Sequence, residues 1–135
     1  MYRPFIALSL ALFSQITSAQ ADTFRQCVAD SGAVMYSAWW CKFCHKQLLE
    51  FSPTLTRGDM HDAEKMKAFP FVKDCGGENP LTLTPSCLPS GARGVPFWTV
   101  RNNAPADEDG KPYSGGGFDV ESIAEFTGCA IPKNR

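Results

Sequence analysis

The chain has 135 residues, with 13 basic and 14 acidic side chains and a formal net charge of −1. This length suits one compact domain rather than two once a leader segment is set aside. The charges are interspersed and form no basic stripe, so a nucleic acid is not expected as a partner.

The first 21 residues have the three-part pattern of a secretory signal peptide. Arg3 supplies a positive charge, an apolar run extends from Phe5 to Phe13, and a polar stretch ends at Ala19-Gln20-Ala21. This apolar run is far shorter than the roughly 20 residues that a membrane-spanning helix needs. We therefore expect residues 1–21 to be a cleaved signal peptide and residues 22–135 to form one exported domain without a stable membrane anchor.

All six cysteines follow the predicted cleavage site, at positions 27, 41, 44, 75, 87 and 129. An even number of cysteines in an exported domain indicates disulfide bonds, although the spacing alone does not choose among the pairings. Cys41 and Cys44 are too close in sequence to brace a fold. We interpret this pair as catalytic and the other four cysteines as structural.

Two elements are predicted before the close cysteine pair. The pattern predicts a helix over Thr23 to Ser31, with Asp22 as its N-terminal cap and Gly32 as its stop. The short apolar run from Ala33 to Ala38 predicts a buried strand.

A second helix is predicted to begin near Cys41 and to end at Ser52-Pro53. Its spacing gives it an apolar side and a polar side. The apolar side holds Cys44, Leu48 and Phe51, and the polar side holds Lys42, Lys46 and Glu50.

Two further helices and a strand are predicted in the middle of the chain. Asp59 can cap a short helix that runs through Lys67, and Phe69 to Lys73 predicts a second strand. Asn79-Pro80 is typical of a helix start, which predicts a helical segment towards Leu88.

The C-terminal part predicts a hairpin and a last helix. Gly94 to Val100 is a turn followed by a strand, and Asp109-Gly110 suits a hairpin turn before a returning strand at Lys111 to Ser114. Asp119 caps a final helix that runs through Thr127.

This order of elements predicts an α/β fold. A helix joins the first two strands, which implies a parallel, right-handed crossover, and the last two strands form an antiparallel hairpin. We expect a central mixed sheet of about four strands flanked by helices.

The position of Cys41 and Cys44, after a strand and at the start of a helix, indicates a redox site. The unpaired N–H groups and the positive dipole end of a helix favour an anion, so a thiol placed there ionises more readily. Cys41 and Cys44 are therefore the candidate catalytic residues.

These residues resemble the thioredoxin superfamily, through the W-C-x-x-C sequence after a strand and Val95-Pro96 before a late strand. More closely, the chain is similar to the small exported thioredoxin-like domain that is also found fused to bacterial vitamin K epoxide reductase homologues. The matching features extend over nearly all of residues 22–132, namely Met35 to Cys44, Cys75 with Cys87, Pro96 to Trp98, and Thr127 to Cys129.

The resemblance implies a thioredoxin-like fold and thiol–disulfide exchange on protein substrates, with no cofactor. Cys41 would be the exposed attacking thiolate and Cys44 the buried resolving thiol. Pro96 would be a cis proline that faces the dithiol, Val95 would offer backbone hydrogen bonds to a substrate peptide, and Trp40 would belong to the rim where the substrate binds. The domain would act in the periplasm, where a further redox partner recycles the dithiol.

The resemblance also pairs Cys75 with Cys87 and Cys27 with Cys129. The second bridge would close a loop of about 100 residues, which is worth about 4–5 kcal/mol if disulfides act through chain entropy. We interpret both bridges as bracing. The alternative is a relay pair that exchanges with Cys41 and Cys44.

The chain departs from the family at two places. Many thioredoxins carry a buried acid six residues before the first cysteine, where this chain has Met35. The residues between the cysteines are Lys42-Phe43, and Lys42 should favour the thiolate of Cys41 and make the disulfide more oxidising. We interpret His45 as a helix-surface residue that modestly tunes the dithiol.

Three other interpretations stay open. The C-x-x-C-H pattern that ends at His45 also fits covalent haem attachment, with Met60, Met66 or His61 as the second iron ligand. A zinc site built from the same motif lacks an obvious fourth ligand, so no metal is expected. A non-catalytic interaction domain braced by disulfides is the third. Within the redox interpretation, oxidase, reductase and isomerase all fit the pattern.

Overall fold

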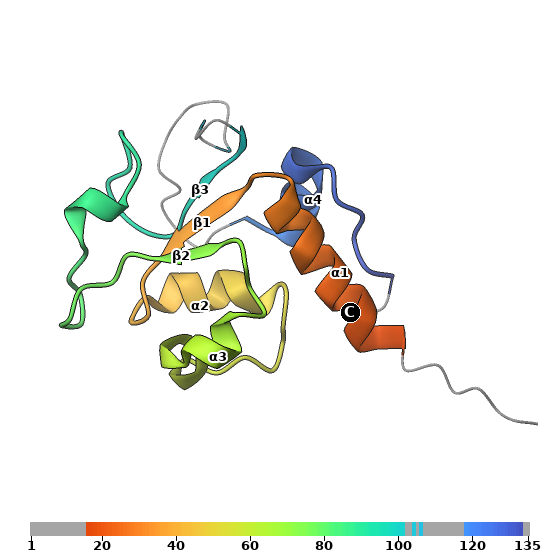
Figure 1. Ribbon diagram of the computed structural model, residues 1–135, viewed down its shortest axis with the longest axis horizontal. Helices are drawn as coiled ribbons and strands as arrows, with labels where there is room; N and C mark the ends of the chain where they lie inside the picture. The colour runs from red at the N-terminus through yellow and green to blue at the C-terminus, as the bar shows by residue number, and fades with distance from the viewer. Residues whose placement is uncertain (1–15, 102–103, 105, 107–117, 134–135) are drawn as a thin grey trace, which may run out of the picture.

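The computed structural model describes residues 16–101, 104, 106 and 118–133, which form an α/β fold with a small mixed sheet of three strands and several helices (Figure 1). Among the described helices, none is long and apolar enough to span a membrane. In chain order the helices and strands are α1 (Ile16–Asp30), β1 (Val34–Ser37), α2 (Lys42–Leu49), the 3-10 helix η1 (Gly58–His61), α3 (Ala63–Met66), β2 (Val72–Asp74), the 3-10 helix η2 (Pro85–Cys87), β3 (Phe97–Thr99) and α4 (Val120–Thr127).

The sheet has the order β2-β1-β3, so the strand that leads to the cysteine pair is its centre. β2 runs parallel to β1, and β3 runs antiparallel to it. The predicted parallel pairing of the first two strands is thereby confirmed. The predicted hairpin turn at Asp109-Gly110 and the fourth strand at Lys111 to Ser114 lie outside the described residues.

The two faces of the sheet are covered differently. Met35 lies opposite Trp98, and both pack into a core formed with α1, α2 and α4. The next pair, Tyr36 opposite Phe97, faces the other way and packs with Cys75 in a second, smaller core. This is the alternation that a strand buried on both faces requires.

A chain of aromatic rings runs through the larger core. Phe51, just after α2, stacks on Phe24 of α1 with ring centroids 5.5 Å apart and contacts Phe71 at 4.6 Å. Phe71 in turn stacks on Trp98 at 5.4 Å, and Trp98 contacts Phe126 of α4 at 5.6 Å. Burying a large apolar side chain stabilises a fold by about 1.5–3 kcal/mol, so these contacts fix α1 and α4 against the sheet.

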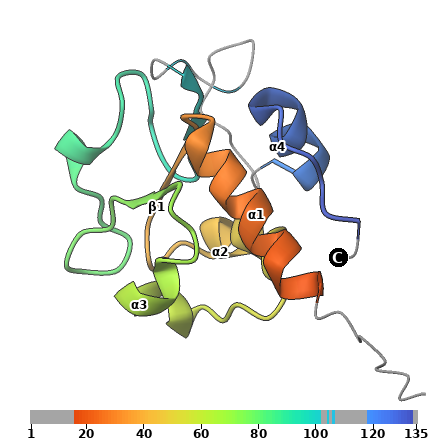
Figure 2. The ribbon, with the colours of Figure 1, turned by 45° about the vertical axis from the view of Figure 1, so that its right-hand side comes forward.

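The second face of the sheet is covered by the segment 75–95 rather than by a long helix. In Figures 1 and 2 this segment projects on the side away from α4. A disulfide between Cys75 and Cys87, with Cα atoms 5.5 Å apart, closes its base. An antiparallel bridge between Gly76 and Leu83 shapes its tip into a narrow loop.

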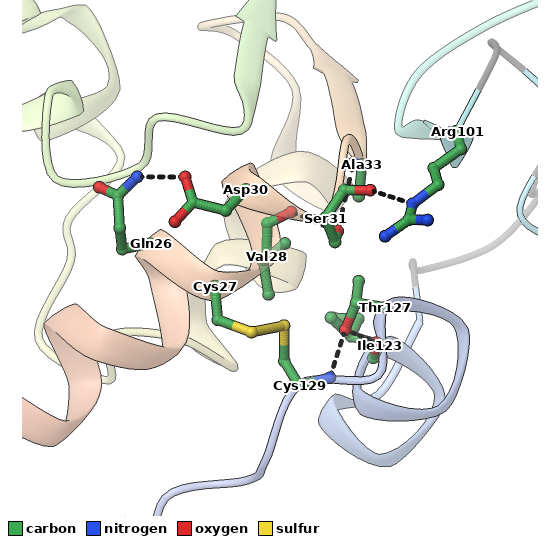
Figure 3. The surroundings of a disulfide bond; sticks show 10 residues. All are labelled: Gln26, Cys27, Val28, Asp30, Ser31, Ala33, Arg101, Ile123, Thr127 and Cys129. Atoms are coloured by element: carbon green, nitrogen blue, oxygen red, sulfur yellow. Dashed lines mark hydrogen bonds between the residues drawn. A yellow bond between two sulfur atoms is a disulfide. The ribbon is translucent and has the colours of Figure 1, made fainter.

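Another disulfide joins the two ends of the fold, between Cys27 in α1 and Cys129 after α4 (Figure 3). Gly128, at a φ of 73°, ends α4 in the left-handed conformation that glycine adopts readily. The turn brings Cys129 back to α1, with the Cα atoms of the two cysteines 5.9 Å apart. Both structural pairs are therefore the ones that the resemblance implies.

The helix α1 differs from the prediction at its start. Its described part extends back to Ile16, well before Thr23, and no glycine or proline interrupts the chain between these positions. Asp22 consequently lies inside the helix and pairs with Arg25 instead of acting as the N-terminal cap. The predicted signal peptide thus overlaps the first turns of α1, and its residues 1–15 lie outside the described residues.

The helix predicted from Asp59 through Lys67 is divided into η1 and α3. Asp62 caps α3 by accepting hydrogen bonds from the backbone N–H groups of Glu64 and Lys65. Asp59 lies instead in η1. The prediction chose the wrong aspartate because both are followed by polar, helix-compatible residues.

The helix predicted from Asn79 towards Leu88 is wrong, since only η2 forms there. Leu81 has a φ of 64°, which no right-handed helix contains. The backbone N–H of Thr84 donates to the Cys75 carbonyl at 2.8 Å instead of to a helical partner. By contrast, the predicted helices after Cys41 and after Asp119 are confirmed as α2 and α4, and these two residues are the N-caps.

Candidate active site

Cys41 is the N-cap of α2, with an extended backbone at φ −77° and ψ 111°. Its sulfur accepts a hydrogen bond from the backbone N–H of Cys44 at 3.1 Å. The sulfur thus takes the place that a serine or aspartate oxygen usually fills at a helix start. A negative charge on this atom is favoured by the N–H bond and by the helix dipole.

Cys41 and Cys44 are paired as a disulfide, with Cα atoms 5.2 Å apart. Cys44 is fully buried, as expected, but Cys41 is only 4% exposed. The prediction that Cys41 is exposed is therefore wrong for this oxidised form. The reason is that Cys41 packs within the larger core, and its sulfur lies against the backbone of Val95.

The turn before β3 lies next to the cysteine pair, because β3 runs antiparallel to β1 and begins where β1 ends. The Val95–Pro96 peptide bond is cis, and Pro96 is fully buried. The carbonyl oxygen of Val95 lies 3.8 Å from the Cys41 sulfur. In the reduced protein a Cys41 thiol at this place could donate to that carbonyl, since S–H is a weak donor.

Trp39 and Trp40 connect the cysteine pair to the loop at 76–84. The indole N–H of Trp40 donates to the Thr82 carbonyl at 2.9 Å, and that of Trp39 donates to the Gly77 carbonyl at 3.0 Å. A side chain at Gly76 would place its Cβ 2.6 Å from the Trp39 ring, so only glycine fits. Sequence reasoning placed Trp40 at the rim but missed the loop that both tryptophans hold.

Arg57 is a residue at the site that sequence reasoning missed. Its Nη2 donates to the Trp40 carbonyl at 2.8 Å, next to Cys41. It belongs to a reciprocal cap in which the Thr56 N–H donates to the Asp59 carboxylate and the Asp59 N–H donates to the Thr56 hydroxyl. The T-x-x-D spacing of a capping box was the signal that could have identified it.

The Lys65 ammonium binds Asp59 at 2.5 Å. This hydrogen bond, together with those from Thr56, lowers the pKa of the Asp59 carboxyl to about 2. The same contact with Asp59 raises the pKa of Lys65. The charged pair therefore fixes η1 beside the active-site turn.

The two side chains predicted to tune the dithiol have other neighbours in the structure. Lys42 is exposed, and its Nζ lies 5.0 Å from the centroid of the Phe43 ring. The Nε2 atom of His45 lies 2.7 Å from the Leu55 carbonyl, and it must donate there because a carbonyl only accepts. Their influence on the dithiol stays a prediction.

The side chains that covalent haem attachment would use have other partners in the structure. That chemistry needs both cysteine sulfurs for the haem and a histidine nitrogen for the iron. Here the sulfurs are joined to each other, and Nε2 of His45 bonds Leu55. Of the proposed second ligands, Met60 is buried and His61 packs on Trp39 with ring centroids 4.2 Å apart.

A buried amide ties the active-site helix to α4, and sequence reasoning missed it. Gln47 of α2 is fully buried, and its side chain exchanges two hydrogen bonds with the backbone N–H and carbonyl of Phe118. Met35 is also fully buried, and the buried polar or charged side chains of the described residues are Ser37, Gln47 and Thr99. Within the described part of the chain, the larger core therefore holds no buried carboxylate.

A comparison of the chain with models of known protein families and with curated proteins finds no match.

Proposed function

We propose that this protein is an exported thiol–disulfide oxidoreductase with a thioredoxin-like fold, which acts on protein thiols and disulfides through Cys41 and Cys44. The observation that carries the proposal is the setting of the Cys41 sulfur. It caps α2, accepts the Cys44 N–H at 3.1 Å and lies 3.8 Å from the carbonyl that precedes the cis proline Pro96. This setting favours a thiolate that can attack or leave.

In the oxidised form the Cys41–Cys44 bond accepts two electrons from a substrate dithiol. A substrate thiolate attacks the Cys41 sulfur, the bond to Cys44 breaks, and Cys44 leaves as a thiolate that takes up a proton. The second substrate thiolate then attacks the substrate sulfur of the mixed disulfide. Cys41 leaves as a thiolate at the helix start, and the substrate departs with a disulfide.

The reduced form reverses these steps on a substrate disulfide. The Cys41 thiolate attacks one substrate sulfur, and the other leaves as a thiolate that is protonated. The Cys44 thiolate then attacks Cys41, which restores the disulfide and releases the second substrate thiol. A further redox partner would recycle whichever form is consumed.

A polypeptide substrate is supported by the apolar surface around the dithiol. The large apolar side chains that are exposed among the described residues are Phe43, at 43%, and Leu81, at 81%. Phe43 lies between the two cysteines in sequence, and Leu81 lines a cavity together with Trp40. Exposed apolar patches on an otherwise polar surface commonly mark interaction sites.

Export to the periplasm is part of the proposal. The signal-peptide pattern of residues 1–21 and the three disulfides support it, because disulfides persist in oxidising compartments. A chain cleaved before Asp22 would begin within α1. It would keep Phe24, Cys27 and Val28, which hold α1 against the core and α4.

Insulin reduction by dithiothreitol, followed by turbidity, tests the activity. The wild-type chain should accelerate precipitation, Cys41→Ser should return the rate to background, and Lys46→Gln on the exposed side of α2 should behave like wild type. Cys44→Ser should retain a substrate mixed disulfide that is visible on a non-reducing gel. Wild-type protein that is no faster than Cys41→Ser would contradict the proposal.

The burial of Cys41 favours a second candidate, a non-catalytic interaction domain in which Cys41–Cys44 is only a covalent bridge. An attacking thiolate must reach a sulfur that is 4% exposed in this form. In that case Cys44→Ser would trap no substrate, and insulin reduction would stay at background.

A further inference from the structure

A cavity of about 420 Å³ lies beside the active-site turn. Its volume falls in the range of ligand pockets, roughly 300–1,000 Å³. Trp40, which precedes Cys41, is part of its wall, so a ligand there would stand one residue away from the disulfide. The side chains that line it are Trp39, Trp40, Arg57, His61, Pro80 and Leu81.

Leu81 is an unusual residue in this wall. It is 81% exposed, and its φ of 64° makes it the non-glycine residue with a positive φ in the described part of the chain. An exposed leucine in a conformation that favours glycine gives the fold no benefit from burial or from backbone preference. Such positions occur where the surrounding structure holds a side chain for a functional reason.

The loop that carries Leu81 is held firmly next to the dithiol. The indole N–H groups of Trp39 and Trp40 bond the carbonyls of Gly77 and Thr82, and the Cys75–Cys87 disulfide closes the base of the loop. The cavity wall is therefore formed before a ligand arrives, which lowers the entropic cost of binding.

Arg57 is the charged residue in the cavity wall. Arg57 uses Nη2 to bond the Trp40 carbonyl, and a guanidinium has five N–H donors in total. The ion pairs among the described residues are Arg25–Asp22, Lys65–Asp59 and Lys67–Glu64, so Arg57 belongs to none of them. His61 is the other ionisable residue of the lining, and the lining contains no acid.

We infer that this cavity binds an apolar side chain of the substrate polypeptide that stands next to a carboxylate, close to the substrate cysteine. The tryptophans and Leu81 would contact the apolar side chain, and Arg57 would bind the carboxylate. A polypeptide fits better than a small disulfide, since the wall combines apolar side chains with a guanidinium in a cavity of about 420 Å³. The inference rests on the proposed function, because it names the substrate class of the same site.

Binding of synthetic peptides to the oxidised full-length protein tests this inference without any redox step. Three peptides carry serine in place of the substrate cysteine. They differ only in the dipeptide next to this serine, which is Leu-Glu, Leu-Gln or Ser-Gln. Tryptophan fluorescence or calorimetry gives their affinities. The Leu-Glu peptide should bind roughly fivefold more tightly than Leu-Gln, the size of a favourable exposed ion pair, and Ser-Gln should bind most weakly.

The variants assign the preference to residues. Arg57→Gln should abolish the difference between Leu-Glu and Leu-Gln, whereas Arg57→Lys should keep part of it because the charge remains. Leu81→Gly suits the positive φ and should weaken both leucine peptides without lowering stability. Arg101→Gln is the matched control, since Arg101 also bonds a backbone carbonyl, that of Ser31, but at the opposite end of β1 (Figure 3).

Equal affinity for the three peptides, or a carboxylate preference that survives Arg57→Gln, would overturn the inference. The proposed function is tested separately by the reaction of the reduced protein with bis(2-hydroxyethyl) disulfide, which has no group for the cavity. If the protein exchanges with this compound but shows no peptide preference, only the inference about the cavity is contradicted. If it shows the peptide preference but no exchange, only the proposed oxidoreductase activity is contradicted.

Discussion

Asp59 shows how a carboxylate outside the cysteine motif can support the candidate site. It binds Lys65 and closes the reciprocal cap with Thr56, so that the intervening Arg57 is directed to the Trp40 carbonyl. Replacing either partner would loosen η1 rather than the sheet. The effect should therefore be local, and it should depend on pH.

The pKa of the Asp59 carboxyl is lowered from 3.8 to about 2, chiefly by the hydrogen bond from Lys65. A carboxyl with a lowered pKa stabilises the folded protein above its ordinary pKa, and this contribution is lost as the pH falls through the lowered value. The free energy of unfolding of the wild type should thus decrease between pH 4 and pH 2.

Urea unfolding at several pH values measures this contribution. In Asp59→Asn the decrease in this pH window should be smaller than in the wild type, because one titrating carboxyl is removed. Asp30→Asn, in α1 and away from η1, serves as the control and should keep the slope of the wild type. Identical slopes in wild type and Asp59→Asn would contradict the role of this carboxylate.

At the scale of elements, the loop at 76–84 depends on a close approach between backbone and ring. A Cβ at Gly76 would lie 2.6 Å from Cδ1 of Trp39, well inside contact distance. Gly76→Ala should therefore displace the Trp39 ring and weaken its bond to the Gly77 carbonyl. We expect a loss of about 1–3 kcal/mol, the usual cost of overpacking a tight site.

Chemical denaturation followed by tryptophan fluorescence checks this expectation. Gly58→Ala is the matched control, since its Cβ would meet its nearest neighbour, the Thr56 hydroxyl oxygen, at 3.7 Å, an ordinary contact. The same stability for Gly76→Ala and Gly58→Ala would show that the ring moves freely, and that the loop is not held as described.

The elements that the sequence predicted well are those with a cap and a clear periodicity. α2 begins next to Cys41, and α4 is capped by Asp119 and runs to Thr127, as predicted. The helix predicted to begin at Asn79-Pro80 does not form, because tertiary contacts override the local helix-start pattern. The Trp40 indole, which is 42 positions from its partner Thr82, and the Cys75 carbonyl bond this loop instead.

The same physical reason explains what could be predicted of the site. The pairing of Cys41 with Cys44 follows from local spacing, and the helix start follows from the strand before it. The burial of Cys41 depends on Val95, 54 positions away, and the place of Arg57 depends on a backbone carbonyl. Local patterns do not give such contacts, although the T-x-x-D spacing indicates the cap that contains Arg57.

For the whole molecule, the Cys27–Cys129 disulfide is the principal covalent constraint. It joins residues separated by 102 positions and docks α4 on α1 (Figure 3). By loop-closure entropy, replacing both cysteines with serine should cost about 4–5 kcal/mol. The same change at Cys75 and Cys87, separated by 12 positions, should cost less, about 3 kcal/mol.

Urea unfolding of the two double variants compares these costs directly. A larger loss for the short bridge would show that it carries contacts of its own, beyond the loop that it closes. Insulin reduction by the folded variants distinguishes bracing from a relay. If the bridges only brace, the activity per folded molecule should be retained.

The reduction potential of the Cys41–Cys44 couple tests the redox role most directly. It is measured by equilibrating the protein with thiol–disulfide buffers and trapping the free thiols. A dithiol at a helix start, with a stabilised Cys41 thiolate, should have a potential between about −270 and −120 mV, the range of exchange-active proteins. A potential below about −300 mV, typical of structural disulfides, would contradict the account and leave Cys41–Cys44 as a brace.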